Sequence, residues 1–179
     1  MEMDNLRFEL FRITENGDPS SHPRFIEKLR AKIPHTIKVL ESLLNINKYT
    51  CIMFALNIST DDRYDKLALI CPKNVFANPS FVHFLIDKGY LLPLTKCHRD
   101  CLTVYFEEGI VKHIGKSFND TRIVSKWGTG HLYEHSLFEV PSNMGSDVKY
   151  FSSINCDDTI KYFVEFAKSR GVELKSYNY

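Results

Sequence analysis

Cys51 is the residue of this sequence best placed for covalent chemistry. It follows Thr50, a residue type that caps helix N-termini, and it opens an apolar-periodic segment, 51–56, that predicts a short helix. A thiol reacts as the thiolate, and the unpaired N–H groups and dipole of a helix N-terminus favour that negative charge. The sequence therefore makes Cys51 a candidate nucleophile. The alternative is a small, buried, inert residue, as most free cysteines are.

A cysteine nucleophile needs a general base, which is most often a histidine. Of the seven histidines, His113 lies in the middle of a predicted strand. A hairpin turn centred on Asn119 would place His113 directly opposite Ser125, whose hydroxyl could then orient the imidazole. A one-residue slip would place Lys126 there instead. The sequence thus predicts a catalytic set of Cys51, His113 and Ser125, with a half-buried structural His113 as the alternative.

Candidate substrate contacts lie close to this set in the sequence. Thr50 directly precedes the cysteine, and Trp127, the only tryptophan, either lines a substrate groove or fills the core. His131 follows Gly128 and Gly130, so we expect it in a loop near the active cleft.

The segment 97–101, Cys-His-Arg-Asp-Cys, offers three possible metal ligands. A structural zinc site usually has four ligands, and no second pair with suitable spacing is present. His131 and His135 lie four residues apart, but without the His-Glu-x-x-His order of zinc proteases. No glycine-rich phosphate loop occurs either. The sequence therefore predicts no metal and no cofactor.

The hydrophobic periodicity predicts the elements that would position these residues. The first part of the chain would hold a strand at 6–11, a helix from Pro23 that ends or kinks at Pro34, and a second apolar-periodic piece at 36–44. The helix 51–56 would follow, and then a loop with three aspartates. A strand at 67–71 and a helix at 81–88 would complete the N-terminal half. Strands at 102–106, 110–116 and 121–127 would form an antiparallel meander, and a fourth strand at 148–151 would precede a helix at 159–169 capped by Asp157. This order predicts an α+β fold.

Composition limits the possible classes of protein. The chain has 179 residues, of which 44% are apolar and 13% aromatic, so it can bury a sizeable core as a single domain. The 23 basic and 22 acidic residues give a net charge of +1, which argues against binding to nucleic acid. No apolar stretch approaches the length of a membrane span, and the acidic N-terminus does not resemble a signal peptide. Five cysteines, an odd number, favour reduced thiols in the cytoplasm.

Several segments together resemble an uncharacterised bacterial family, one of the domains of unknown function. The segment 49–56 resembles its Asn-Cys-Ile-Ala-Trp-Ala-Leu segment, 111–116 its His-Ala-Gly strand, and 122–128 its Ser-Lys-x-Gly strand. The stretch 130–141 resembles its closing segment. The resemblance covers about residues 45–151, which would form the core between an N-terminal helical region, 1–44, and a C-terminal helix, 157–171.

The order of a cysteine on a helix, a histidine on a strand and a polar residue on the next strand resembles that of papain-like cysteine hydrolases. The resemblance implies a papain-like α+β fold, with N-terminal helices packed on the meander, and a Cys51–His113 dyad that cleaves an amide or isopeptide bond of a protein or peptide through an acyl-enzyme. Ser125 stands where these enzymes use Asn, Asp, Gln or His, with His131 and His135 nearby. This departure motivates the alternative, a non-catalytic interaction module with the same fold. The oligomeric state stays open.

Overall fold

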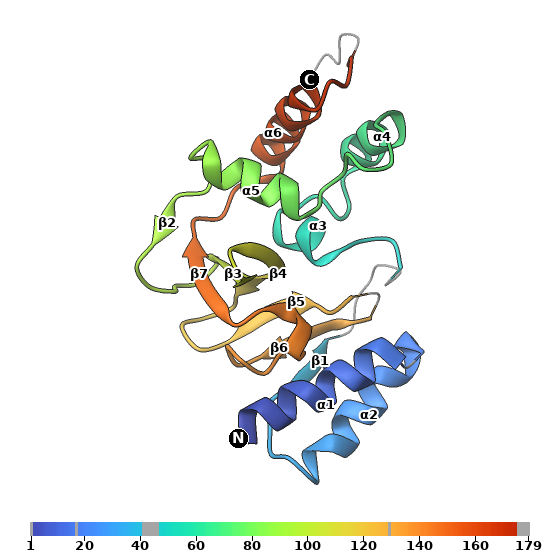
Figure 1. Cartoon of the computed structure of the whole chain (residues 1–179), viewed down its shortest axis with the longest axis vertical. Helices are drawn as coiled ribbons and strands as arrows, with labels where there is room; N and C mark the ends of the chain where they lie inside the picture. Colours follow the sequence, from blue (N-terminus) through green and yellow to red (C-terminus); the bar gives the residue numbers. More distant parts are fainter. Residues whose placement is uncertain (1, 17, 41–46, 129, 175–179) are drawn as a thin grey trace.

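A computed structural model describes residues 2–16, 18–40, 47–128 and 130–174 (Figure 1). The α-helices are α1 (Glu2–Asn16), α2 (His22–Arg30), α3 (Cys51–Ala55), α4 (Asp62–Ile70), α5 (Pro79–Asp87) and α6 (Cys156–Ser169). Short 3-10 helices span Pro19–Ser21 and Ser142–Met144. The strands are β1 (Lys38–Leu40), β2 (Pro93–Leu94), β3 (Leu102–Glu107), β4 (Ile110–Ser117), β5 (Ile123–Lys126), β6 (Leu132–His135) and β7 (Asp147–Phe151).

The seven strands form one antiparallel sheet in the order β1-β6-β5-β4-β3-β7-β2. The predicted meander is confirmed as β3, β4 and β5, and β6 extends it by one more hairpin. The predicted strand at 148–151 is confirmed as β7, which pairs with β3. β6 was predicted only as a loop, and β2 was not predicted at all.

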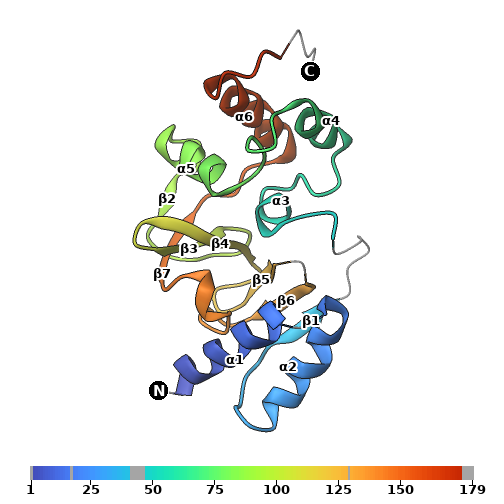
Figure 2. The ribbon, with the colours of Figure 1, turned by 45° about the vertical axis from the view of Figure 1, so that its right-hand side comes forward.

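The sheet lies between α1 and α2 on one side and α3 to α6 on the other (Figure 2), and hydrophobic side chains form a core on each face. On one face, α1 and α2 pack against Tyr105, Ile123, Trp127 and Tyr133. On the other, residues of α3 to α6 pack against β3, β4 and Phe151. The α+β class is therefore confirmed, with N-terminal helices, an antiparallel sheet and a C-terminal helix. None of the helices in the described ranges is long and apolar enough to span a bilayer.

Two sequence predictions in the N-terminal region are wrong. The segment 6–11 is the middle of α1 and not a strand: Leu6 and Leu10, four residues apart, are buried, whereas Phe8 is exposed. Burial at i and i+4 is the helical period, so the alternation of apolar residues was misleading. The segment 36–44 was predicted as a helical piece, but residues 38–40 form β1; positions 41–44 lie outside the described residues.

The segment 67–71 is also helical, since it belongs to α4 and not to a strand. Asp61 caps this helix by accepting a hydrogen bond from the Arg63 N–H, so the aspartates of the predicted loop form a helix start. The predicted helices near residues 81–88 and 159–169 are confirmed as α5 and α6, although α6 begins earlier and is capped by Asn155 instead of Asp157.

The β4–β5 hairpin has a different register from the predicted one. Lys116 pairs with Val124 and Ser117 with Ile123, because the loop is longer than a turn centred on Asn119. The Asn119 side chain accepts hydrogen bonds from the backbone of Thr121 and Arg122, which widens the turn. The register is shifted by two residues, so the prediction that His113 faces Ser125 is wrong.

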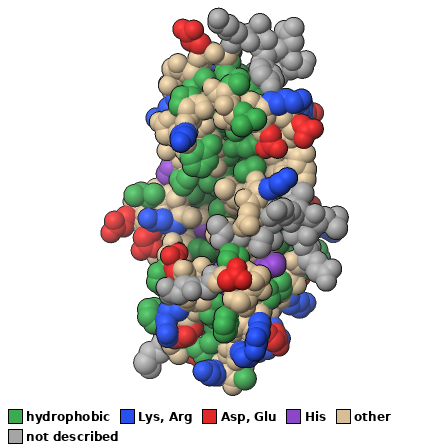
Figure 3. All heavy atoms as spheres, turned by 90° about the vertical axis from the view of Figure 1, so that its right-hand side faces the viewer, with side chains coloured by type: hydrophobic (Ala, Val, Ile, Leu, Met, Phe, Trp, Pro, Cys, Tyr) green, Lys and Arg blue, Asp and Glu red, His purple; other side chains and the backbone are tan. Residues whose placement is uncertain are grey.

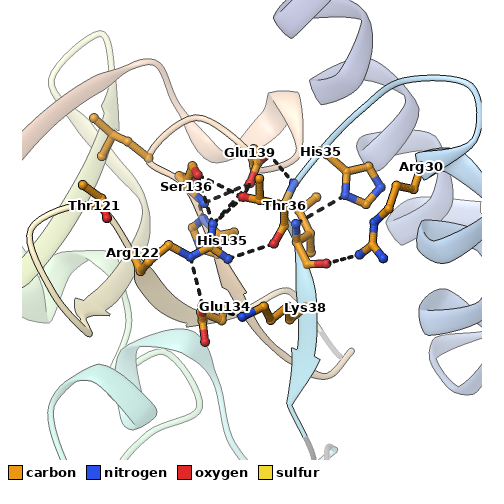
Figure 4. A network of polar contacts seen from close by, with 12 residues as sticks. Arg30, His35, Thr36, Lys38, Thr121, Arg122, Glu134, His135, Ser136 and Glu139 are labelled. Carbon is orange, nitrogen blue, oxygen red and sulfur yellow. Dashed lines mark hydrogen bonds and ion pairs between the residues drawn. The ribbon is translucent and has the colours of Figure 1, made fainter.

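A polar network fastens the N-terminal segment to the sheet (Figure 4). The Glu139 carboxylate, which is almost buried, accepts hydrogen bonds from the Thr36 N–H at 2.7 Å and from the Ser136 N–H at 3.0 Å. Arg122 donates to the Glu134 carboxylate at 2.9 Å and to the Thr36 carbonyl at the same distance. Burial alone would raise the pKa of Glu139, but the bonds from Thr36 and Ser136 and the charge of Arg122 outweigh it and lower the pKa. The network therefore holds an ionised carboxylate.

Candidate active site

Cys51 occupies the first turn of α3, where the sequence predicts it. Thr50 is the N-cap, and its hydroxyl accepts a hydrogen bond from the Met53 N–H at 3.2 Å. The side chain of Cys51 is partly buried at the edge of the core that includes Ile114 of β4. Burial raises the pKa of the thiol, although backbone hydrogen bonds from Ile114 and Ile52 and the charge of Lys126 favour the thiolate. In this structure Cys51 is therefore a neutral thiol.

Lys126 is a neighbour of Cys51 that sequence reasoning did not place in the site. Its side chain is fully buried, donates to the carbonyl oxygens of Gly128 and Gly130 at 2.9 Å each, and lies 5.0 Å from the centre of the Tyr49 ring. Burial lowers the pKa of Lys126 to about 8, and Cys51 acts in the opposite direction. The sequence indicated this position only through the place of Lys126 between Ser125 and Trp127, which are both buried.

His113 is buried on β4, and its ring lies 5.5 Å from that of Tyr105. Burial, with a smaller contribution from His135, lowers the pKa of His113 to about 3, so the imidazole is neutral at pH 7. The Nε2 atom is buried and has no hydrogen-bond partner in the described part of the chain. A neutral imidazole has one ring nitrogen that can accept a proton, but a pKa of about 3 makes it a weak base at pH 7.

The structure does not join Cys51 and His113 by a hydrogen bond. Adjacent residues of a strand point to opposite faces of the sheet. Ile114 belongs to the core beside α3, whereas the ring of His113 lies against Tyr105 in the core beside α1 and α2. Cys51 packs against the core of Ile114, so it lies beside the strand position next to His113 but on the opposite face of the sheet. Their catalytic roles stay predictions.

Ser125 is fully buried and directed toward His135. Its hydroxyl lies 2.8 Å from His135 Nε2 and accepts a hydrogen bond from the Trp127 indole N–H at 3.0 Å. His135 Nδ1 lies 2.8 Å from the Ser136 carbonyl, which can only accept, so Nδ1 carries the proton and Nε2 accepts from Ser125. The hydroxyl proton of Ser125 therefore serves His135 and not His113.

The predicted substrate contacts have different environments. Trp127 is fully buried and stacks on Tyr133 at 4.2 Å, so it fills the core and does not line a groove. Thr50 is exposed beside Cys51. His131 begins the segment that leads into β6, and its Nε2 is buried without a hydrogen-bond partner among the described residues. Burial, and then the charges of His22 and Lys126, lower the pKa of His131.

The distribution of charged side chains and of possible metal ligands indicates no further binding site among the described residues. Basic and acidic side chains are interspersed over the face shown in Figure 3, with no field of one sign. Within the described ranges, no group of three or more His, Cys, Asp or Glu side chains is arranged to hold a metal ion.

No protein-family model, no curated protein and no solved structure matches this chain.

Proposed function

We propose that this chain is a papain-like cysteine hydrolase that acts on an amide or isopeptide bond of a protein or peptide. Cys51 is the nucleophile and His113 is the general base. The observation that carries the proposal is the packing of α3 against β4, in which Cys51 lies against the core that includes Ile114, the residue next to His113. The order of a cysteine helix against a histidine strand supports a papain-like arrangement.

The reaction requires the imidazole to reach the sulfur. In the resting protein both groups are neutral and lie on opposite faces of the sheet, so β4 and β5 must part before His113, whose Nε2 is unbonded within the described structure, can accept the thiol proton. The sulfur then attacks the carbonyl carbon, and the backbone N–H groups at the start of α3 stabilise the oxyanion. His113 returns the proton to the leaving amine, and water hydrolyses the acyl-enzyme.

The rate of alkylation by iodoacetamide tests the proposal without a known substrate. Cys71 is a matched comparison, because it is also partly buried and burial also raises its pKa. Trypsin releases Cys51 and Cys71 in separate peptides, 49–63 and 67–73, so both rates come from one digest. We expect Cys51 to react about 10-fold faster than Cys71 at pH 7, since the parting of β4 and β5 would bring a base to Cys51 and not to Cys71.

His113→Gln should remove this advantage, whereas His98→Gln, in an exposed loop, should not. Glutamine approximates the volume of the buried imidazole, and circular dichroism of the variant checks that it folds. Equal rates at Cys51 and Cys71, unchanged by His113→Gln, would refute the hydrolase.

A non-catalytic interaction module is the second candidate. It is favoured by exposed apolar side chains on α4 and after it: Leu69 and Ile70 are 84% and 55% exposed, and Phe76 is 41% exposed. Hydrophobic side chains gather in the upper half of the face in Figure 3, on the side of the molecule where α4 lies. Contiguous exposed apolar side chains are typical of protein–protein contact surfaces. Equal thiol reactivities would favour this candidate.

A further inference from the structure

The loop before β3 brings two cysteines together, at a distance from the candidate active site along the chain. The sulfur atoms of Cys97 and Cys101 are 3.4 Å apart. Cys97 is partly buried, whereas Cys101 is fully buried. Among the described residues, no other two cysteine sulfurs lie within hydrogen-bond distance of each other. Hydrogen bonds from neighbouring residues hold both sulfurs in place.

Ser117 at the end of β4 fixes both sulfurs. Its hydroxyl oxygen lies 2.7 Å from the Cys97 sulfur, 3.1 Å from the Cys101 sulfur and 3.0 Å from the Thr103 hydroxyl. The backbone around the pair is anchored as well. The Ser117 N–H donates to the Cys101 carbonyl and the Asp100 N–H to the Ser117 carbonyl, at 2.9 Å each. The two thiols are therefore held side by side against the end of one strand.

We propose that Cys97 and Cys101 form a redox-active dithiol, which a peroxide oxidises to a reversible intramolecular disulfide. A disulfide bond is about 2.05 Å long, so the sulfurs must approach by only about 1.4 Å, which side-chain rotation can supply. Ser117 would lose its two sulfur contacts and keep the one to Thr103. The bond would fasten residues 97–101 into a closed loop at the end of β4.

The chemistry proceeds in two steps. The more accessible Cys97 attacks the peroxide, breaking the O–O bond and giving a sulfenic acid and one water molecule. Cys101 then attacks the sulfenic sulfur, the S–S bond forms, and a second water molecule leaves with the remaining thiol proton. Two S–H bonds are oxidised and one peroxide is reduced to two water molecules. Burial raises the pKa of Cys97, so the first step should accelerate as the pH rises from 7 to 9.

Oxidation of the whole chain with hydrogen peroxide tests the proposal. Intact mass should fall by about 2 Da, the mass of two hydrogen atoms, and a phosphine reductant should restore it. The position of the pair makes the product easy to identify: trypsin cleaves after Lys96, Arg99 and Lys112, so the disulfide must link peptides 97–99 and 100–112. In the reduced protein these two peptides separate.

Cys97→Ser changes a partly buried loop residue and should abolish the linked peptide, whereas Cys71→Ser should leave it unchanged. The proposal is overturned if Cys97 is recovered as sulfinic or sulfonic acid while Cys101 remains a thiol. It is equally overturned if the linked peptides contain another cysteine in place of Cys101.

Discussion

Two buried histidines predict that the fold loses stability in mild acid. The pKa of His113 is lowered to about 3 and that of His135 to about 4, in both cases mainly by burial. The pKa of an unfolded histidine is about 6.5. Between these values the unfolded chain binds more protons than the folded one, so the free energy of unfolding must decrease as the pH falls below about 6.5. His131, whose pKa is also lowered by burial, acts in the same direction.

The size of the effect follows from the pKa differences. At pH 5 the unfolded imidazole lies about 1.5 pH units below its pKa, while the folded His113 and His135 are still neutral. With about 1.4 kcal/mol per unit, each histidine removes about 2 kcal/mol of stability between pH 7 and pH 5, and the two together remove about 4 kcal/mol. Glu139 does not oppose this, because a carboxylate with a lowered pKa loses its contribution only at lower pH.

Urea unfolding at pH 7, 6 and 5 measures the free energy of unfolding directly. In His113→Gln the difference between pH 7 and pH 5 should shrink by about half, to about 2 kcal/mol, whatever the variant costs at pH 7. His98→Gln, on an exposed side chain, is the control and should keep the full difference. A His113→Gln variant with an unchanged pH dependence would show that His113 is not a buried neutral group, and the assignment of the base would then be untenable.

Two further substitutions test the packing of the hairpin and the polar network. A Cβ on Gly115 would lie 2.7 Å from Ile123 Cγ2 and 2.9 Å from Ser125 Cβ. Gly115→Ala should therefore lower the free energy of unfolding, measured in urea, by about 1–3 kcal/mol. In the Ile123→Ala background the same substitution should cost less, because the clashing methyl group is gone. Additive costs in the double variant would contradict the close approach of β4 and β5. Glu139→Gln should lower the free energy of unfolding by about 2 kcal/mol at pH 7, because one buried donor from Thr36 or Ser136 loses its charged acceptor. A loss of about 2 kcal/mol predicts a melting temperature several degrees lower. A melting temperature within 1 °C of that of the unmodified protein would contradict the prediction.

Local signals in the sequence predicted the elements that depend on neighbouring residues. Thr50 caps α3 as expected, and Gly89, with a positive φ of 72°, lies just after the end of α5. The meander was predictable because period-two alternation coincided with turn residues between the strands. In each case the information lies within a few positions of the feature it specifies.

Elements whose burial depends on distant partners were not predictable. Leu69 and Ile70 are apolar but exposed, so the segment 67–71 looked like a buried strand although the buried residues of α4 are Tyr64 and Leu67. Exposed apolar residues obscure the helical spacing of the buried ones when the pattern is read over only a few positions. The short strand β1 is defined by its pairing with β6, which lies about a hundred residues further along the chain.

In the candidate site, the face of the sheet on which a side chain lies was predictable from the sequence, but its neighbours were not. A register error of two residues leaves each side chain on the same face of the sheet, so the sequence correctly put His113 and Ser125 on one face while giving them the wrong partners. Which helices cover that face depends on contacts between residues far apart in the sequence. Because α1 and α2 occupy the face of His113, and α3 packs on the face of Ile114, the thiol and the imidazole lie on opposite faces of the sheet. A change of rotamer alone cannot carry a side chain through a sheet, so the proposed hydrolysis requires β4 and β5 to part beyond Lys116, where their pairing ends.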